Sequence, residues 1–312
     1  MSNAMAEGTL KNHRANINKF QRFCKYFKQQ SAPPTTDTLV LYLEWLAQKS
    51  GTIGTVVNSL SSIKLYCKIN NFPVQIFEMF IVKLMMKAVK RTLPFRKNKR
   101  KLISPITFKN MLAQTSVLGT SQHVVKLALT LGYMGLLRVS NCMPKTLSQF
   151  KPNQHSTFAD LNIVNRKLVL TMKWSKTRVN TEETHIILPE VKDPEVSPVN
   201  HYQNMLMANK HLNITPKHPM LIFPSGAPIL SPFYNRITKF LAKKTVGTSR
   251  GYTSHSFRRS GATFYYAAGA TALQLAKQGT WASPQYLTYI LSDSTMPSPV
   301  QKASDKIFNS LI

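Results

Sequence analysis

The sequence predicts a mainly α-helical protein with one small antiparallel β-sheet, divided into two domains. Apolar residues recur at helical spacing over most of the chain, whereas apolar and β-branched residues alternate between Asp160 and Leu188. The length of 312 residues suits two domains better than one. A basic stretch at 87–101 separates a shorter helical part from a longer mixed part. We therefore expect a helical domain followed by an α+β domain.

Four helices are expected in the N-terminal part of the chain. A Pro-Pro pair at 33–34 ends the first helix, and Gly51 separates the second from the third. Thr36 or Asp37 suits the N-cap of the second helix, because a short polar side chain can accept a hydrogen bond from the first turn. The expected ranges are 10–29, 36–48, 55–69 and 74–91.

Residues 87–101 contain eight Lys or Arg, no acid, and one proline, Pro94. Dense like charge beside a proline favours an extended linker. Such a strap would let two domains close around a polyanion, and its 96–101 segment also resembles a nuclear localisation signal. We divide the chain into a helical domain (5–91), a basic linker (92–103), a second domain (104–292) and a C-terminal tail (293–312).

The second domain is expected to contain a β-hairpin. Apolar and β-branched residues alternate on both sides of a polar turn, and Lys176 lies at or near the tip of that turn. A strand is expected at 220–223. Helices are expected at 107–114, 123–137, 198–209, 231–244, 254–268, 271–277 and 284–291.

The chain is strongly basic, with 41 Lys and Arg against 12 Asp and Glu and a formal net charge of +29. A charge that large opposes compaction unless an anionic partner neutralises it. Nucleic acid is the first candidate, although an anionic membrane surface or ribosomal RNA would fit the charge alone equally well. No run of about 18 apolar residues is present, so we expect no membrane partner.

Three cysteines, Cys24, Cys67 and Cys142, are widely spaced. Their spacing matches neither a disulfide framework nor a metal site, so buried thiols in an intracellular, reducing compartment are expected. We expect neither a metal nor a cofactor.

His255 and Arg258 form a His-x-x-Arg pattern that suits phosphate chemistry. Three residues apart on a helix, both side chains would lie on one face. Arginine holds two phosphate oxygens through its planar fork, and histidine transfers protons near neutral pH. Either residue alone would also suit an ordinary solvated helix face.

Residues 254–290 resemble the C-terminal active-site block of the tyrosine recombinases, or phage-type integrases. In that family a His-x-x-Arg helix precedes a Gly-(His/Trp) turn and a helix with a tyrosine nucleophile, which here would be Trp281 and Tyr289. The segment around Arg138-Val-Ser-Asn141 is similar to the family's T-G-L-R-x-S-E block, with Asn141 where an acid is common.

The resemblance implies a residue set and a reaction. Tyr289 would attack a phosphate, leaving a 3′-phosphotyrosyl link and a free 5′-hydroxyl, with Tyr286 as the rival nucleophile. Lys176 would protonate the leaving oxygen, with Lys173 and Arg178 as neighbours that could be mistaken for it. The implied catalytic residues are Arg138, Lys176, His255, Arg258, Trp281 and Tyr289, and the expected DNA contacts are Arg91, Arg96, Lys97, Lys99, Arg100, Lys101, Lys173, Arg178 and Arg259.

The resemblance further implies a helical core-binding domain that clamps duplex DNA, an α+β catalytic domain, and dimers to tetramers on DNA. The phrase from Gly279 to Ile290 is similar to recombinases of eukaryotic transposons such as the DIRS, Ngaro and Crypton groups. A DNA-associated protein is expected, nuclear if the source is eukaryotic. The apolar tail would dock in cis or on a neighbouring protomer. A type IB topoisomerase, an inactive DNA-binding relative and a basic RNA-binding protein remain alternatives.

Overall fold

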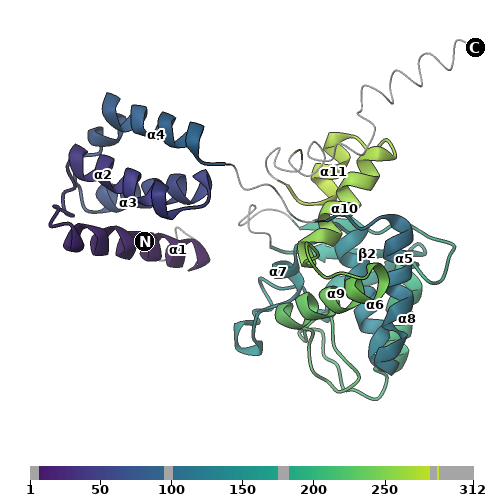
Figure 1. The fold of residues 1–312 in the computed structure, drawn as a ribbon. Coiled ribbons are helices and arrows are strands. Elements are labelled where there is room, and N and C mark those ends of the chain that lie inside the picture. The colour runs from purple at the N-terminus through teal and green to yellow at the C-terminus, as the bar shows by residue number, and fades with distance from the viewer. Residues whose placement is uncertain (1–6, 95–100, 175–182, 282–286, 288–312) are drawn as a thin grey trace, which may run out of the picture. The chain divides into compact units, whose positions relative to one another are not determined.

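The computed structural model describes residues 7–94, 101–174, 183–281 and Leu287. The chain divides into two compact units, Met1–Asn98 and Lys99–Ile312 (Figure 1). Most described residues are helical, and the strands form one three-stranded antiparallel sheet in the second unit. This confirms the predicted fold class. No helix in the described part of the chain is long and apolar enough to cross a membrane.

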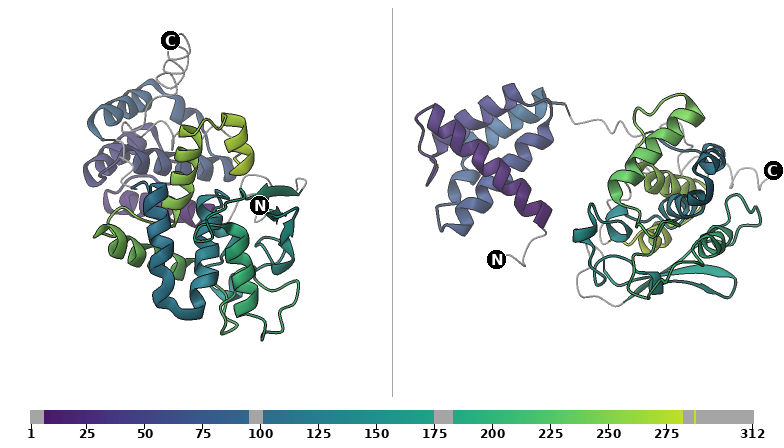
Figure 2. Two further views of the ribbon diagram at one scale, coloured as in Figure 1. Left: turned by 90° about the vertical axis from the view of Figure 1, so that its right-hand side faces the viewer. Right: turned by 90° about the horizontal axis from the view of Figure 1, so that it is seen from below.

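The first unit is a helical module with its own core (Figure 2). Helix α1 packs on α3, and α2 packs on both α3 and α4. The ring of Tyr42 lies 5.0 Å from that of Phe20, and its hydroxyl is 2.8 Å from Ser59 Oγ. The helices are α1 (Glu7–Tyr26), α2 (Thr36–Lys49), α3 (Ile53–Ile69), the 3₁₀ turn η1 (Gln75–Glu78) and α4 (Phe80–Thr92).

The expected continuous helix at 74–91 is wrong. A 3₁₀ turn ends at Glu78, Met79 has extended backbone (φ −59°, ψ 141°), and α4 starts afresh at Phe80. The break sets which side of α4 faces the core. Val82 is buried, whereas Phe80 is 77% exposed.

The N-cap expected at Thr36 or Asp37 is also wrong, because the cap lies one residue before Thr36. Thr35 caps α2, because its Oγ1 accepts the Thr38 N–H at 3.1 Å.

The second unit is built around α6, whose residues from Leu127 to Tyr133 are all buried. Helices α8 and α10 both pack on it. The contact with α10 is close at Gly261, where an added Cβ would lie 1.9 Å from the Tyr133 carbonyl oxygen. The helices and turns are α5 (Pro105–Ala113), η2 (Gln114–Ser121), α6 (Gln122–Tyr133), α7 (Val139–Cys142), η3 (Leu147–Gln149), η4 (Phe158–Asp160), α8 (Pro198–Ala208), α9 (Ser231–Val246), α10 (Ser254–Ala267) and α11 (Ala272–Gln278).

The sheet has the order β1-β2-β3, and both pairings are antiparallel. Leu161 pairs with Leu170, and Met172 pairs with Thr184. Alternate residues of β2 are buried, as expected for a sheet with one face on the core. The strands are β1 (Leu161–Val164), β2 (Lys167–Met172) and β3 (Thr184–Ile187). The expected strand at 220–223 is wrong, because this segment makes only an isolated bridge between Ile222 and Pro228.

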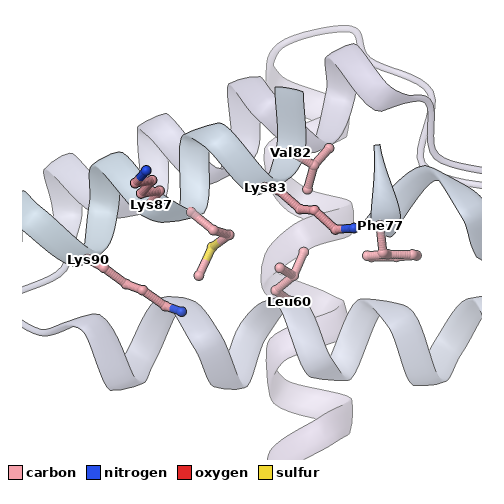
Figure 3. Close-up of a pocket in the computed structure, with 7 residues that line it drawn as sticks. Leu60, Phe77, Val82, Lys83, Lys87 and Lys90 are labelled. Carbon is pink, nitrogen blue, oxygen red and sulfur yellow. The ribbon is translucent and has the colours of Figure 1, made fainter. Parts of the chain in front are cut away.

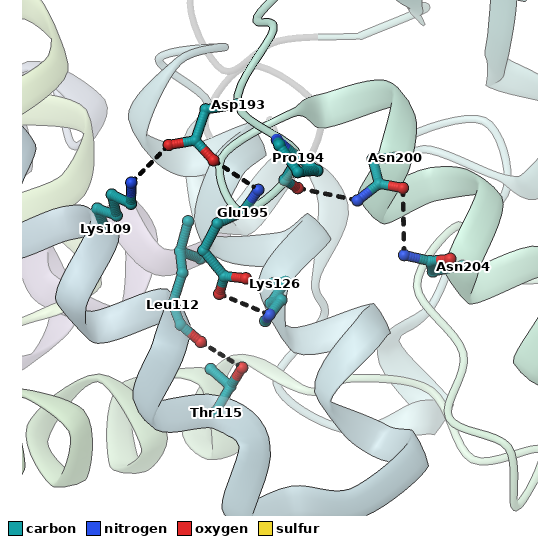
Figure 4. A network of polar contacts seen from close by, with 9 residues as sticks. All are labelled: Lys109, Leu112, Thr115, Lys126, Asp193, Pro194, Glu195, Asn200 and Asn204. Atoms are coloured by element: carbon teal, nitrogen blue, oxygen red, sulfur yellow. Dashed lines mark hydrogen bonds and ion pairs between the residues drawn. The ribbon is translucent and has the colours of Figure 1, made fainter.

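Two ion pairs tie the segment before α8 to the helices beside it (Figure 4). Lys109 of α5 lies 2.6 Å from Asp193, and Lys126 of α6 lies 2.7 Å from Glu195. His201 of α8 is 1% exposed. Burial, with the Lys126 charge nearby, lowers the pKa of His201 to about 4.

The expected helix at 123–137 ends early, at Tyr133. Leu136 takes a left-handed backbone conformation with φ 51°, and the Leu137 N–H returns to the Leu131 carbonyl at 3.3 Å. Arg138 is therefore the N-cap residue of the short helix α7 rather than the last residue of a long helix. The turn from α6 to α7 matters because it brings Leu136 and Arg138 to the site described next.

Candidate active site

Helix α10 carries His255, Arg258 and Arg259. At its start the Ser256 hydroxyl accepts the Thr253 N–H at 3.1 Å, and the Ser256 N–H donates to the Thr253 carbonyl at 2.8 Å, which fixes the first turn. His255 is exposed in that turn, whereas Arg258 is 2% exposed and Arg259 is 4% exposed. The structure thus places the His-x-x-Arg pair on one helix, with only its histidine at the surface.

Arg258 is held from three sides. One Nη donates to the Leu136 carbonyl in the turn after α6, and the other donates to the Gly279 carbonyl after α11 at 2.6 Å. The guanidinium carbon lies 4.0 Å from the centroid of the Trp281 ring. Because a buried cation needs such partners, these contacts fix the orientation of the guanidinium.

Arg138 contacts the same short segment from another direction. Its Nη1 donates to the Thr280 carbonyl at 3.3 Å and to Thr280 Oγ1 at 3.4 Å. Arg138 is half-buried, so it lies nearer to solvent than Arg258. Residues 279–281 therefore bring together both predicted catalytic arginines and the predicted tryptophan.

Gly279 and Trp281 are fitted to each other. A Cβ on residue 279 would lie 1.9 Å from an atom of the Trp281 ring, so only glycine leaves room for the indole there. Trp281 is 5% exposed and packs with Leu136, Ala262 and Leu275 in a small cluster of its own. The turn at 279–281 is thus part of a packed structure.

Lys173, expected as a DNA contact or as a rival for the hairpin lysine, directly follows strand β2. Its Nζ lies 2.5 Å from Oδ1 of the buried Asp160. Lys101 is exposed, with its Nζ 5.9 Å from the Tyr252 ring centroid, and Arg91 is exposed near the end of α4. The remaining predicted site residues lie outside the described part of the chain: Arg96, Lys97, Lys99, Arg100, Lys176, Arg178, Tyr286 and Tyr289.

The three cysteines are free and buried. Burial raises the pKa of the Cys24 thiol to about 11 and that of the Cys142 thiol to about 12, and it also raises the pKa of Cys67. These thiols are poor nucleophiles, because the thiolate is the reactive form. Within the described ranges, no three His, Cys, Asp or Glu residues are grouped as a metal site.

Some features of the structure escaped sequence reasoning. The carbonyls of Leu136 and Gly279 are acceptors supplied by backbone, which no residue pattern reveals. In the first unit a pocket of about 270 Å³ has an apolar lining that includes Phe77 and Met86 (Figure 3). Its basic lining residues are Lys83, Lys87 and Lys90. Their spacing along the sequence could have predicted that these lysines lie together, because residues three and four apart share a helix face.

No protein-family model and no curated protein matches the sequence. Solved structures do match its fold. The Tn1549 transposon integrase in complex with transposon right-end DNA superposes with a TM-score of 0.65 at 13% identity, over 99% of this chain and 96% of that one. The chain has the fold of the tyrosine recombinases.

Two further recombinases share this fold with similarly low sequence identity. XerH bound to palindromic difH substrate gives a TM-score of 0.60 at 10% identity, over 91% of this chain and 76% of that one. The lambda integrase dimer bound to a COC′ core site gives 0.57 at 15% identity, over 94% and 92%. The likeness establishes the tyrosine-recombinase fold.

Proposed function

We propose that the protein is a site-specific DNA recombinase that cuts and rejoins duplex DNA through a 3′-phosphotyrosyl intermediate. The observation that carries the proposal is the convergence of Arg138 and Arg258 on residues 279–281, in a chain with the tyrosine-recombinase fold. Tyr289, the proposed nucleophile, follows this segment closely in the sequence.

The two arginines suit stabilisation of a phosphoryl transition state. Two carbonyls and an indole ring hold the guanidinium of Arg258 in one orientation, so little reorganisation would accompany the reaction. Arg138, half-buried beside it, would hold a second phosphate oxygen.

The proposed reaction conserves bond energy. The Tyr289 oxygen attacks phosphorus, the bond to the 5′ oxygen breaks, and Lys176 gives that oxygen its proton. His255, exposed at the start of α10, would accept the tyrosine proton. Trp281 would support Arg258 rather than transfer a proton, because an indole N–H only donates. Attack of a 5′-hydroxyl on the phosphotyrosyl link reverses the step and rejoins DNA without ATP.

Duplex DNA is the proposed partner. The net charge of +29 suits a polyanion, and exposed cations of α4 would contribute phosphate contacts from the first unit. We assign this unit the role of a DNA clamp and expect dimers to tetramers on DNA. The protein would be DNA-associated in the cell, and nuclear if its source is eukaryotic.

The test is to capture the covalent product. The protein is incubated in EDTA with duplex fragments that span the flanks of its own gene, quenched with SDS, and the protein-linked DNA is sequenced. A recombinase yields protein joined to the 3′ end at one recurring site. Supercoiled plasmid, labelled duplex and labelled RNA are tested in parallel. Relaxation of the plasmid without site preference would contradict the proposal and indicate a topoisomerase. Salt-sensitive duplex binding without linkage would indicate an inactive relative, and equal binding to RNA would indicate an RNA-binding protein.

A further inference from the structure

Asp160 is a buried carboxylate with three donors gathered around it. It ends the turn η4 and is 3% exposed. Its Oδ2 accepts the Thr157 N–H at 2.7 Å and the Thr157 hydroxyl at 2.9 Å. Its Oδ1 lies 2.5 Å from Lys173 Nζ. Each carboxylate oxygen therefore has a defined partner.

The Asp160–Lys173 pair lies where two strands meet. Asp160 immediately precedes β1, and Lys173 immediately follows β2. The β1–β2 ladder is paired only from Leu161 and Leu170 onward, away from this end. The ion pair thus joins the start of β1 to the end of β2 beyond the last backbone pairing.

The ion pair with Asp160 gives Lys173 a different role from that of Lys176. A cation held against a buried carboxylate is costly to withdraw, because the carboxylate would be left uncompensated. Lys173 is therefore suited to a fixed structural role. Lys176 lies three residues further along the sequence, which is at most about 11 Å of extended chain. Fixing residue 173 thus limits where residue 176 can be placed.

We propose that Asp160 is a positioning residue for strand cleavage. Through Lys173 it fixes the end of β2 from which the chain runs to Lys176, the general acid, while Lys173 itself transfers no proton. This inference rests on the proposed function. Under this proposal Asp160 affects only the protonation of the leaving 5′ oxygen and no other part of the reaction.

A sulfur leaving group isolates that step. When the bridging 5′ oxygen is replaced by sulfur, the leaving thiolate is stable at neutral pH and requires no proton. Cleavage rates are compared on oxygen-bridged and sulfur-bridged duplexes of the captured site. Asp160→Asn should cleave the oxygen substrate at least about 10-fold more slowly than wild type and the sulfur substrate within about 3-fold of it. An equal loss on both substrates overturns the proposal.

Asp193→Asn is the matched control, because it also removes a carboxylate paired with a lysine at 2.6 Å, that of Lys109. It should leave both rates unchanged.

Lys173→Arg keeps a cation and donors for Asp160 but cannot give up a proton. It should cleave the oxygen substrate within about 3-fold of wild type. If Lys173→Arg cleaved the oxygen substrate about 10-fold more slowly than wild type but the sulfur substrate at the wild-type rate, Lys173 would be the proton donor and the proposal would be overturned.

Hydrogen exchange separates this proposal from the proposed function. Asp160→Asn should accelerate amide exchange in β2 and β3 relative to wild type, and Asp193→Asn should not. Unchanged exchange in Asp160→Asn overturns the positioning role even if DNA is cleaved. Wild-type protein that forms no covalent product overturns the proposed function, whatever the exchange result. If Asp160→Asn fails to fold, Lys173→Gln replaces it, because the Gln amide removes the charge of Lys173 but can still donate to the buried Asp160 carboxylate.

Discussion

The guanidinium of Arg258 stacks on the indole of Trp281, with 4.0 Å between the guanidinium carbon and the ring centroid. The same guanidinium donates to the backbone carbonyls of Leu136 and Gly279. A cation over an indole face in a buried setting is stabilised by about 2 kcal/mol. The stack therefore couples the stability of the 279–281 turn to the orientation of the arginine proposed to hold the phosphate.

Truncating the indole tests this coupling. Trp281→Ala should lower the free energy of unfolding by about 3–5 kcal/mol, because it removes a buried aromatic ring and the support of Arg258. Trp281→Phe keeps an aromatic face and should lose about 1–2 kcal/mol. Urea unfolding measures both. A Trp281→Ala variant as stable as Trp281→Phe would show that the ring does not hold the turn.

A methyl group at residue 279 provides an independent test of the same turn. Gly279→Ala places a Cβ 1.9 Å from the Trp281 ring, so the ring or the turn must shift. We expect a loss of about 1–3 kcal/mol in unfolding free energy. Gly54→Ala is the control, because no atom lies within 4 Å of its added Cβ, and it should be neutral or slightly stabilising. Thermal unfolding measures both variants. Equal changes in Tm for Gly279→Ala and Gly54→Ala would contradict the packing of Trp281 against Gly279.

His201 predicts a pH dependence with a definite sign. Its pKa is lowered to about 4 by burial, so the folded state disfavours its protonation relative to the unfolded chain. The stability that neutral His201 contributes is fully present above the unfolded pKa of about 6.5 and is lost as pH falls toward 4. Between pH 7 and pH 4.5 this amounts to about 2–3 kcal/mol.

His201→Gln cannot titrate, and it isolates this contribution from that of the carboxylates. Unfolding free energies are measured for both proteins across the same pH range. The wild-type curve should fall more steeply than the variant curve between pH 6.5 and 4.5. Parallel curves would show that His201 protonates with an ordinary pKa in the folded protein.

The lysines beside the pocket of α4 are expected to contact DNA phosphates. Lys87→Gln and Lys90→Gln should each reduce the slope of log affinity against log salt by about 1, and weaken binding to all duplexes alike. Lys109→Gln is the control, because Lys109 is already paired with Asp193 in the second unit. Fluorescence anisotropy with a labelled duplex at several salt concentrations measures the slopes. Slopes unchanged from wild type would remove α4 from the proposed DNA surface.

The helices could be predicted from sequence because long apolar periodicities identify elements reliably. Their ends were less predictable. The break at Met79 and the early end of α6 at Tyr133 depend on which face each segment packs, and tertiary contacts decide that. The expected strand at 220–223 was wrong as an element and not only at its ends. Apolar residues there are buried, but no neighbouring strand pairs with them to extend the sheet.

The candidate site shows the same division. Phosphate chemistry pointed to Arg258, and the resemblance to the tyrosine recombinases pointed to Arg138 and Trp281. Their partners could not be read from the sequence. Arg258 is held by two backbone carbonyls, whose positions arise only from folding. The pairing of Lys173 with Asp160 likewise depends on how β1 aligns with β2.

The proposed nucleophile provides the most direct test of the account. Wild type, Tyr289→Phe and Tyr286→Phe are incubated in EDTA with the captured duplex, quenched with SDS, and the DNA-linked peptide is sequenced. We predict a covalent band for wild type and Tyr286→Phe, no band for Tyr289→Phe, and DNA on the peptide that contains Tyr289. A band that persists in Tyr289→Phe, or is lost only in Tyr286→Phe, would contradict the assignment of Tyr289 as the nucleophile.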